Sequence, residues 1–194
     1  MMRSDEKYVP AMSFDWLTPL YDPVVRWLMP ESKFKSRLVR RASIDERHRV
    51  LDVGCGTATL TLMVKRARPG ARVEGLDGDP KILEIARRKA AGAGAEISFS
   101  EGMAYAMPYA DGSFDRALSS MVLHHLTEAN KRRTLREVFR VLAPGGEFHV
   151  ADFRRANKSL AALMSEAGFE GVGEHARYRT LFGTLSLWEA RRPA

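Results

Sequence analysis

The sequence is poor in cysteine, in long apolar runs and in signals for export. A single cysteine, Cys55, among 194 residues excludes an intrachain disulfide and a zinc site built from cysteines. No uninterrupted apolar run reaches the ~18 residues of a membrane-spanning helix. The first residues, MMRSDEKYVPAMSFDW, include acids and lack the continuous apolar segment of a secretory signal. We therefore expect a cytoplasmic protein, and we identify no metal site.

Positive charge exceeds negative charge, and the formal net charge is +7. This balance favours anionic partners such as nucleic acid, acidic lipid headgroups or small anions. The basic residues do not form one block, but they are concentrated at 26–41, 131–140 and 154–158. Solvated helix faces account for most of them without any partner, so charge alone does not identify a function.

From residue 49 the sequence alternates short apolar runs with helical patterns. Strands are predicted at 49–53, 71–77, 95–102, 114–123 and 147–153, and helices ending near 67, 91, 142 and 168 lie between or after them. The helix near 142 is predicted to stop at a turn formed by residues 144–146. Residues 171–191 are predicted to form two strands joined near Phe182 and Gly183.

This alternation predicts right-handed βαβ units and an α/β fold with a parallel sheet. The last two strands are joined by too short a link for a parallel crossover, so they should form an antiparallel hairpin. We therefore predict a seven-stranded mixed sheet flanked by helices, with one antiparallel hairpin strand at an edge. Residues 49–194 would form this sheet domain, and residues 1–48, helical in part, would form an N-terminal segment of the same single domain.

The glycine loop at 54–56 could hold several kinds of ligand. A phosphate-binding Walker loop needs Lys-Ser or Lys-Thr after its last glycine, whereas Gly56 is followed by Thr57. A dinucleotide loop has Gly or Ala at the sixth position, and counting from Gly54 that position is Thr59. The loop therefore matches neither pattern well.

Two acids next to this loop carry more information. Asp52 directly precedes the loop and Asp77 ends the second strand, so both should project from the carboxyl edge of the sheet. A carboxylate such as that of Asp77 can accept from both hydroxyls of a ribose. An acid beside the loop would repel a pyrophosphate but would suit a cation. S-adenosylmethionine has a ribose, an ammonium and a sulfonium, and it lacks phosphate.

On these residues the sequence resembles the class I S-adenosylmethionine-dependent methyltransferases, and within them the ubiquinone/menaquinone and phospholipid N-methyltransferase-like group. The resemblance covers about residues 49–153 and, less specifically, the tail. Four ordered stretches carry it: VLDVGCGTA, VEGLDGDPKILEIARRKA, MPYADGSFDRALSSMVLHHL and LREVFRVLAPGGEFHVADF. It implies a Rossmann-like methyltransferase fold with an N-terminal helical lid, S-adenosylmethionine as the cofactor and S-adenosylhomocysteine as its product.

The resemblance also implies roles for single residues. The loop glycines would let the backbone approach the methionyl part of the cofactor. Asp52 would order the loop and reach the ammonium, Asp77 would bind the ribose hydroxyls, and Ile82 would pack on the adenine. Two serines at the end of the fourth strand would place backbone carbonyls near the ammonium and the methyl group. The predicted cofactor-binding set is Asp52, Gly54, Cys55, Gly56, Asp77, Gly78, Ile82, Gly102, Met103, Ala104, Ser119 and Ser120.

The chain departs from the family pattern at three positions. Ala58 replaces the third loop glycine. Gly102 is followed by Met103 where the family usually has an aspartate that binds the adenine amino group, so Met103 can offer only packing. Gly78 stands where a bulky apolar residue often lies on the adenine. We therefore expect looser recognition of the adenine than is usual.

Three residues are candidates for work on the methyl acceptor. His124 and His125, just beyond the fourth strand, are the candidate general bases, and His125 occupies the more typical family position. Because adjacent side chains seldom share a face, we expect at most one of them to point into the site. Tyr21 matches a lid position that lines the site. A structural role for these histidines, such as capping the following helix, is the alternative.

The acceptor is predicted to be a small or lipid-like molecule, with an amine, such as a phospholipid headgroup, ahead of oxygen or sulfur. The basic, aromatic-rich segment 14–38 and the short link after residue 153, which leaves no room for a cap over the substrate, favour a lipid. That segment predicts peripheral membrane contact, and an uncapped site could be roofed by a second copy in a homodimer. Nucleic acid is disfavoured, because the NPPY motif of its amino-methylating enzymes is absent. The alternatives are a soluble O- or S-methyltransferase and a non-catalytic cofactor-binding regulator.

Overall fold

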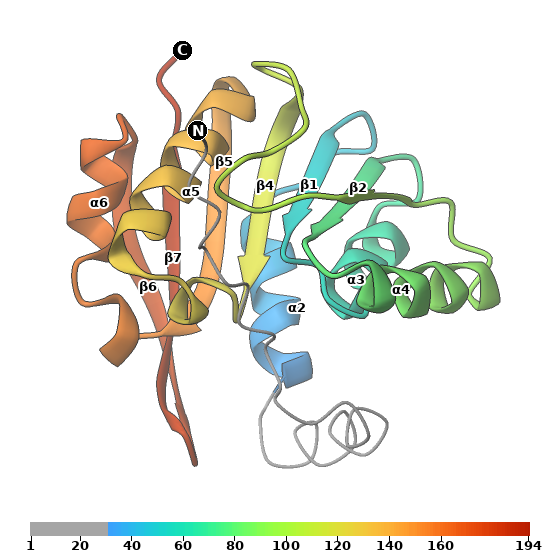
Figure 1. The fold of residues 1–194 in the computed structure, drawn as a ribbon, viewed down its shortest axis with the longest axis horizontal. Helices are drawn as coiled ribbons and strands as arrows, with labels where there is room; N and C mark the ends of the chain where they lie inside the picture. The colour runs from blue at the N-terminus through green and yellow to red at the C-terminus, as the bar shows by residue number, and fades with distance from the viewer. Residues whose placement is uncertain (1–30) are drawn as a thin grey trace, which may run out of the picture.

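The structure, a computed structural model, describes residues 31–194, in which helices flank a seven-stranded sheet (Figure 1). The strands lie in the order β3-β2-β1-β4-β5-β7-β6. Their bounds are β1 Arg49–Val53, β2 Arg72–Asp77, β3 Ser98–Glu101, β4 Phe114–Ser120, β5 Leu142–Phe153, β6 Glu170–Thr180 and β7 Gly183–Arg191. The five strands from β3 to β5 are parallel, and β7 runs antiparallel to both of its neighbours. The predicted mixed sheet is confirmed, with the reversed strand one place in from the edge.

The helices form where the sequence supplies apolar periodicity and end signals. They are α2 Glu31–Arg41, α3 Thr59–Ala67, α4 Pro80–Gly92, α5 Glu128–Val141 and α6 Leu160–Glu166, with short 3-10 turns at Leu123–His125 and Arg155–Asn157. Asp79 caps α4 by accepting from the backbone N–H groups of Lys81 (2.9 Å) and Ile82 (3.4 Å), and Pro80 occupies the first turn. Thr127 caps α5 in the same way through the N–H of Asn130 (3.2 Å).

Two apolar cores hold the helices on opposite faces of the sheet. Alternate residues of a strand point to opposite faces, so Leu51 and Val53 pack with α5 and α6, while Val50 packs with α2 and α3. Phe34 and Leu38 of α2 are fully buried in the second core. The described end of the N-terminal segment therefore packs on the sheet, and the rest of the predicted lid, including Tyr21, lies outside the described residues.

Two local predictions near strand ends are wrong. The residues predicted as a turn at 144–146 lie inside β5, which starts at Leu142 immediately after α5, and the pairing of β4 with β5 is irregular there. Gly145 allows this path because it adopts a φ of 76°. The fourth strand ends at Ser120 and not at residue 123, because Met121 turns the backbone left-handed with a φ of 63°.

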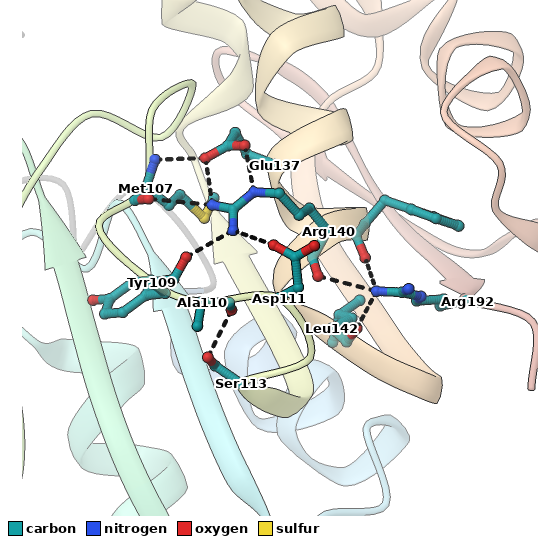
Figure 2. Close-up of polar contacts among 10 residues, drawn as sticks. Met107, Tyr109, Ala110, Asp111, Ser113, Glu137, Arg140, Leu142 and Arg192 are labelled. Atoms are coloured by element: carbon teal, nitrogen blue, oxygen red, sulfur yellow. Dashed lines mark hydrogen bonds and ion pairs between the residues drawn. The ribbon is translucent and has the colours of Figure 1, made fainter.

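Arg140 of α5 holds the long connection between β3 and β4 in place through hydrogen bonds and an ion pair (Figure 2). Arg140 donates to the carbonyls of Tyr109 (2.7 Å) and Met107 (3.2 Å), and it pairs with Asp111 (2.8 Å) and Glu137 (2.8 Å). Glu137 in turn accepts from the N–H of Met107 (2.7 Å). This connection also carries Gly102 and Met103, so the network holds the segment that follows two predicted cofactor residues.

In the part of the chain that the structure describes, no helix is both long enough and apolar enough to cross a membrane.

Candidate functional site

The glycine loop, residues 54–56, follows β1; hydrogen bonds hold its backbone at Gly54 and Cys55, and there is free space beside Gly56. Gly54 and Cys55 donate their N–H groups to the carbonyl of Leu76 (2.8 and 2.9 Å), which ties the loop to the end of β2. Gly54 has a φ of 69°, and a Cβ there would lie 2.4 Å from the Val122 side chain. A Cβ on Gly56 would meet nothing within 4 Å. The first glycine is therefore required by packing, while the second leaves space in which a ligand can approach the backbone.

Ala58, at the position of the third family glycine, is the N-cap of α3 and has left-handed backbone angles, with a φ of 62°. It is fully buried, and its N–H donates to the carbonyl of Cys55 (3.0 Å). An L-residue in this conformation is strained by about 1 kcal/mol relative to glycine. The loop thus keeps the backbone path that a third glycine would take, at the cost of local strain.

Cys55 turns its side chain away from the open face. A Cβ on Gly75 of β2 would lie 2.9 Å from the Cys55 Sγ, so the thiol packs against the middle of the sheet. Burial raises the pKa of the thiol. Both backbone groups of Cys55 are already bonded, to Leu76 and Ala58. The arrangement gives Cys55 a part in holding the loop.

Asp77 joins the loop to the end of β2. Its carboxylate accepts from the N–H of Gly56 (2.9 Å) and from that of Asp79 (3.1 Å). Burial raises the pKa of Asp77, and the hydrogen bonds from these two N–H groups oppose that rise. The carboxylate thus lies beside the open face of the loop, where a ligand with two vicinal hydroxyls could share its oxygens.

Asp52 is a buried acid without a cationic partner. Its side chain is only 1% exposed and accepts from the Thr61 hydroxyl (2.6 Å). Burial raises the pKa of Asp52 to about 6. Among residues 31–194 no lysine or arginine forms an ion pair with it; the nearby Lys35 pairs with Glu31. A buried carboxylate in this state fits a site that takes a positively charged ligand.

The departures at Gly78 and Met103 are linked in the structure. A Cβ on Gly78 would lie 2.9 Å from the Met103 Sδ, so the thioether lies where a larger residue after Asp77 would be. Gly102 is packed equally closely, since a Cβ there would lie 3.0 Å from Leu76 and from Pro108. The Met103 side chain thus takes the place of a bulky apolar residue at position 78, and it reaches that place from the connection that follows β3.

The remaining predicted cofactor residues frame this region. Ile82, in the first turn of α4, and Ala104 are half-buried. Ser119 is buried and donates to the carbonyl of Val53 (3.0 Å), which couples the ends of β1 and β4. The Ser120 hydroxyl is buried without a hydrogen-bond partner among the described residues. The fold therefore brings the ends of β1, β2 and β4 together, and places the carboxylates of Asp52 and Asp77 near half-buried apolar side chains.

His124 is held by an acid that the sequence analysis did not single out. Asp152, 1% exposed near the end of β5, lies 2.8 Å from the His124 Nδ1 through its Oδ1. Its Oδ2 accepts from the N–H groups of Leu123 (2.7 Å) and His124 (3.3 Å). The available signal was an acid in the predicted fifth strand, and the structure places that strand next to the fourth.

His124 and His125 lie side by side, and which of them faces a bound acceptor stays a prediction. Their ring centroids are 3.9 Å apart, and both residues belong to the 3-10 turn Leu123–His125. His125 is exposed, and no acid among residues 31–194 forms a hydrogen bond with it. Partial burial of its ring, and then the charge on His124, lower the pKa of His125. The geometry therefore favours His124 over His125 as a proton acceptor.

The histidine–aspartate pair can act on protons. With the proton on Nδ1 held by Asp152, the Nε2 of His124 carries a lone pair, and no described residue bonds to it. Asp152 would also stabilise the imidazolium formed when Nε2 takes a proton. Val122, which contacts the glycine loop, immediately precedes this turn, so the turn that carries His124 begins beside the loop.

Comparison with known proteins gives consistent results. A family model described as a methyltransferase domain matches residues 50–146. The chain is 37% identical over 161 residues to the demethylmenaquinone methyltransferase of Thermus thermophilus, covering 82% of this chain and 72% of that one. It is 34% identical over 175 residues to the enzyme of the same name from Deinococcus radiodurans, covering 88% and 70%.

The fold also matches solved structures. The cyclase SpnF superposes with a TM-score of 0.75 at 21% identity, covering 84% of this chain and 81% of that one. At this identity the likeness concerns the fold alone, and it includes the strand order given above.

Proposed function

Because the chain belongs to the class I S-adenosylmethionine-dependent methyltransferases and resembles their demethylmenaquinone methyltransferase group, we propose that it methylates a ring carbon of a reduced quinone. The methyl donor is S-adenosylmethionine. The lipid-amine acceptor predicted from the sequence has no support among these relatives, which are named for a quinone. A small-molecule acceptor agrees with both the prediction and the relatives.

The residues around the loop fit this donor. We assign Asp77 to the ribose hydroxyls, Asp52 to the cationic end, and Ile82 and Met103 to the faces of the adenine. The fit rests on the buried carboxylate of Asp52, which forms no ion pair with any of residues 31–194, and on the open space above Gly56. When bound, S-adenosylmethionine supplies an electrophilic methyl group attached to a positively charged sulfur.

The acceptor must be activated by the protein, and this is the task we assign to His124. A quinol ring carbon becomes a good nucleophile when the hydroxyl conjugated with it loses its proton. The Nε2 of His124 would accept that proton, and Asp152 would stabilise the resulting imidazolium. The ring carbon bonds to the methyl group as the methyl–sulfur bond of the donor breaks and S-adenosylhomocysteine leaves. That carbon then loses its own proton to water, which restores the aromatic ring, and the His124 imidazolium returns its proton to the quinol oxygen. The held histidine–aspartate pair is the observation that carries the proposal.

The test is transfer of labelled methyl groups to a reduced, short-chain 1,4-naphthoquinol. His124→Ala is expected to lower kcat by about 10² or more, and His125→Ala by less than about threefold. Asp152→Asn should also lower kcat and change its pH dependence, because it alters the tautomer held at His124. Binding of S-adenosylhomocysteine should be the same in all three variants. Equal losses in the two histidine variants, or a methyl group found on oxygen, would contradict the proposal.

A further inference from the structure

The tip of the β6–β7 hairpin exposes two large apolar side chains. Leu181 is 75% exposed and Phe182 is 60% exposed, and they are the large hydrophobic side chains left exposed among residues 31–194. In Figure 1 the hairpin projects beyond the sheet at the end where the arrowheads of β1 and β4 lie, the end that carries the candidate site. Two adjacent exposed apolar residues of this size at the tip of a projecting hairpin indicate an interaction surface.

The turn presents these side chains on a fixed backbone. The strands stay paired up to Thr180 and Gly183. The Thr180 hydroxyl donates to the carbonyl of Gly183 (2.8 Å) and accepts from the N–H of Phe182 (3.1 Å). Gly183 has a φ of 125°, which glycine adopts without strain. The tip is thus ordered by local hydrogen bonds while its apolar side chains remain in solvent.

Basic residues surround the tip on the side of β5 and β6. The segment after β5 is tied to the hairpin, since the N–H of Arg154 donates to the carbonyl of Thr184 (2.9 Å). This segment and the end of β6 carry the exposed cations Arg154, Arg155, Lys158, Arg177 and Arg179. Of these, Arg154 and Arg177 contact Glu174, and the other three form no ion pair with a described residue.

Helix α2 adds cations on the other side. A shallow groove of about 410 Å³ lies between α2 and Tyr178 of β6, and Lys33, Arg37 and Arg40 line it. Its lining contains hydroxyls and cations and no carboxylate. Such a groove suits a phosphate group, while the apolar tip beside it suits hydrocarbon.

We infer that this surface docks on a bilayer containing anionic phospholipid, with Leu181 and Phe182 entering the acyl region and the surrounding cations contacting headgroup phosphates. Apolar residues ringed by lysine and arginine are the pattern of interfacial membrane binding. A second copy is disfavoured as the partner, because it would bring two cationic rings together. Docking would set the carboxyl edge of the sheet at the membrane surface. The sequence prediction placed membrane contact at residues 14–38; residues 31–38 of that segment belong to α2, and the others lie outside the described residues.

The inference goes beyond the proposed function, because docking does not depend on the acceptor. The full chain would be sedimented with vesicles of phosphatidylcholine alone and with vesicles containing about one third phosphatidylglycerol. We expect binding to the anionic vesicles that weakens at high salt. Leu181→Ser with Phe182→Ser should weaken that binding at least about tenfold. Circular dichroism and the affinity for S-adenosylhomocysteine should stay unchanged in this variant, because neither side chain packs in the core.

Two double variants that remove the same amount of charge distinguish the effect of cations near the hairpin tip on vesicle binding from the effect of the overall net charge. Arg155→Gln with Lys158→Gln should weaken vesicle binding about tenfold. Arg47→Gln with Arg72→Gln removes the same charge near the amino ends of β1 and β2, and should change binding less than about threefold. Equal effects of the two pairs, or unchanged binding of the tip variant, would overturn the inference.

Two further outcomes would overturn it as well. One is the absence of any binding to anionic vesicles. The other is a dimer that the tip variant converts to a monomer, which would assign the tip to self-association. Methyl transfer to a water-soluble naphthoquinol is measured in parallel. Transfer without vesicle binding would refute docking alone, and vesicle binding without transfer to any quinol would refute the proposed function alone.

Discussion

Replacing Asp52 by asparagine should stabilise the free protein and weaken cofactor binding. Burial raises the pKa of Asp52 from 3.8 to about 6, so the folded chain holds a proton that the unfolded chain has released between these two values. Stability therefore falls as pH rises from 4 through 6. A difference of about two pKa units corresponds to about 3 kcal/mol that is lost above pH 7.

Asparagine cannot ionise, and the Thr61 hydroxyl can still donate to its carbonyl oxygen. Its amide nitrogen gains no partner, which costs about 1 kcal/mol. Asp52→Asn should therefore raise the free energy of unfolding by about 1–2 kcal/mol at pH 8 and leave it equal or slightly lower at pH 4. Urea unfolding at several pH values, followed by circular dichroism, measures the difference between variant and wild type.

Asp115 provides the matched control, because its pKa is shifted the other way. Its hydrogen bonds from the Arg49 side chain lower the pKa of Asp115, so its contribution to stability is present at neutral pH and is lost as pH falls through that lowered value. Asp115→Asn should therefore destabilise the protein at pH 8, where Asp52→Asn stabilises it. If Asp52→Asn is destabilising at pH 8, or if its effect does not vary with pH, burial does not destabilise the ionised form of Asp52.

Three more substitutions test the site and its supports. Asp77→Asn should weaken S-adenosylhomocysteine binding by about 1–3 kcal/mol in calorimetry, because ribose hydroxyls lose a charged acceptor; an unchanged affinity would mean that the ribose is bound elsewhere. Ala58→Gly should relieve the left-handed strain and raise the free energy of unfolding by up to about 1 kcal/mol, and a loss of more than 1 kcal/mol would show that the Ala58 methyl group matters more than the strain. Arg140→Ala should cost about 1–3 kcal/mol and speed amide exchange at Met107, whose N–H donates to Glu137; unchanged exchange there would refute the fastening of this connection by α5.

The elements that are set by local sequence were predictable. Apolar periodicity indicated the strands, and Pro80 marked the start of α4. Because the first two strands were predicted to be parallel, Asp52 and Asp77 near their ends were predicted to lie at the same edge of the sheet. Gly145 was misjudged because a glycine pair after a helix usually indicates a turn. Here long-range pairing with β4 and β7 extends the strand back to Leu142.

Contacts between distant residues could not be predicted in the same way. The pairing of His124 with Asp152 depends on the register of β4 against β5 and on the 3-10 turn that follows Met121. The position of Met103 over Gly78 depends on how the connection after β3 folds back. In both cases the sequence shows the residue types, but which side chains come into contact depends on how the strands and connections pack.

The most direct test of the proposed function is the position of the transferred methyl group. The wild-type chain would be incubated with methyl-labelled S-adenosylmethionine and a reduced naphthoquinol that carries deuterium at its free ring carbon. The product would be examined by mass spectrometry and NMR. We predict a methyl group on that carbon with loss of the deuterium. A methyl group on oxygen with the deuterium retained, or no transfer by a chain that binds the donor, would contradict the account.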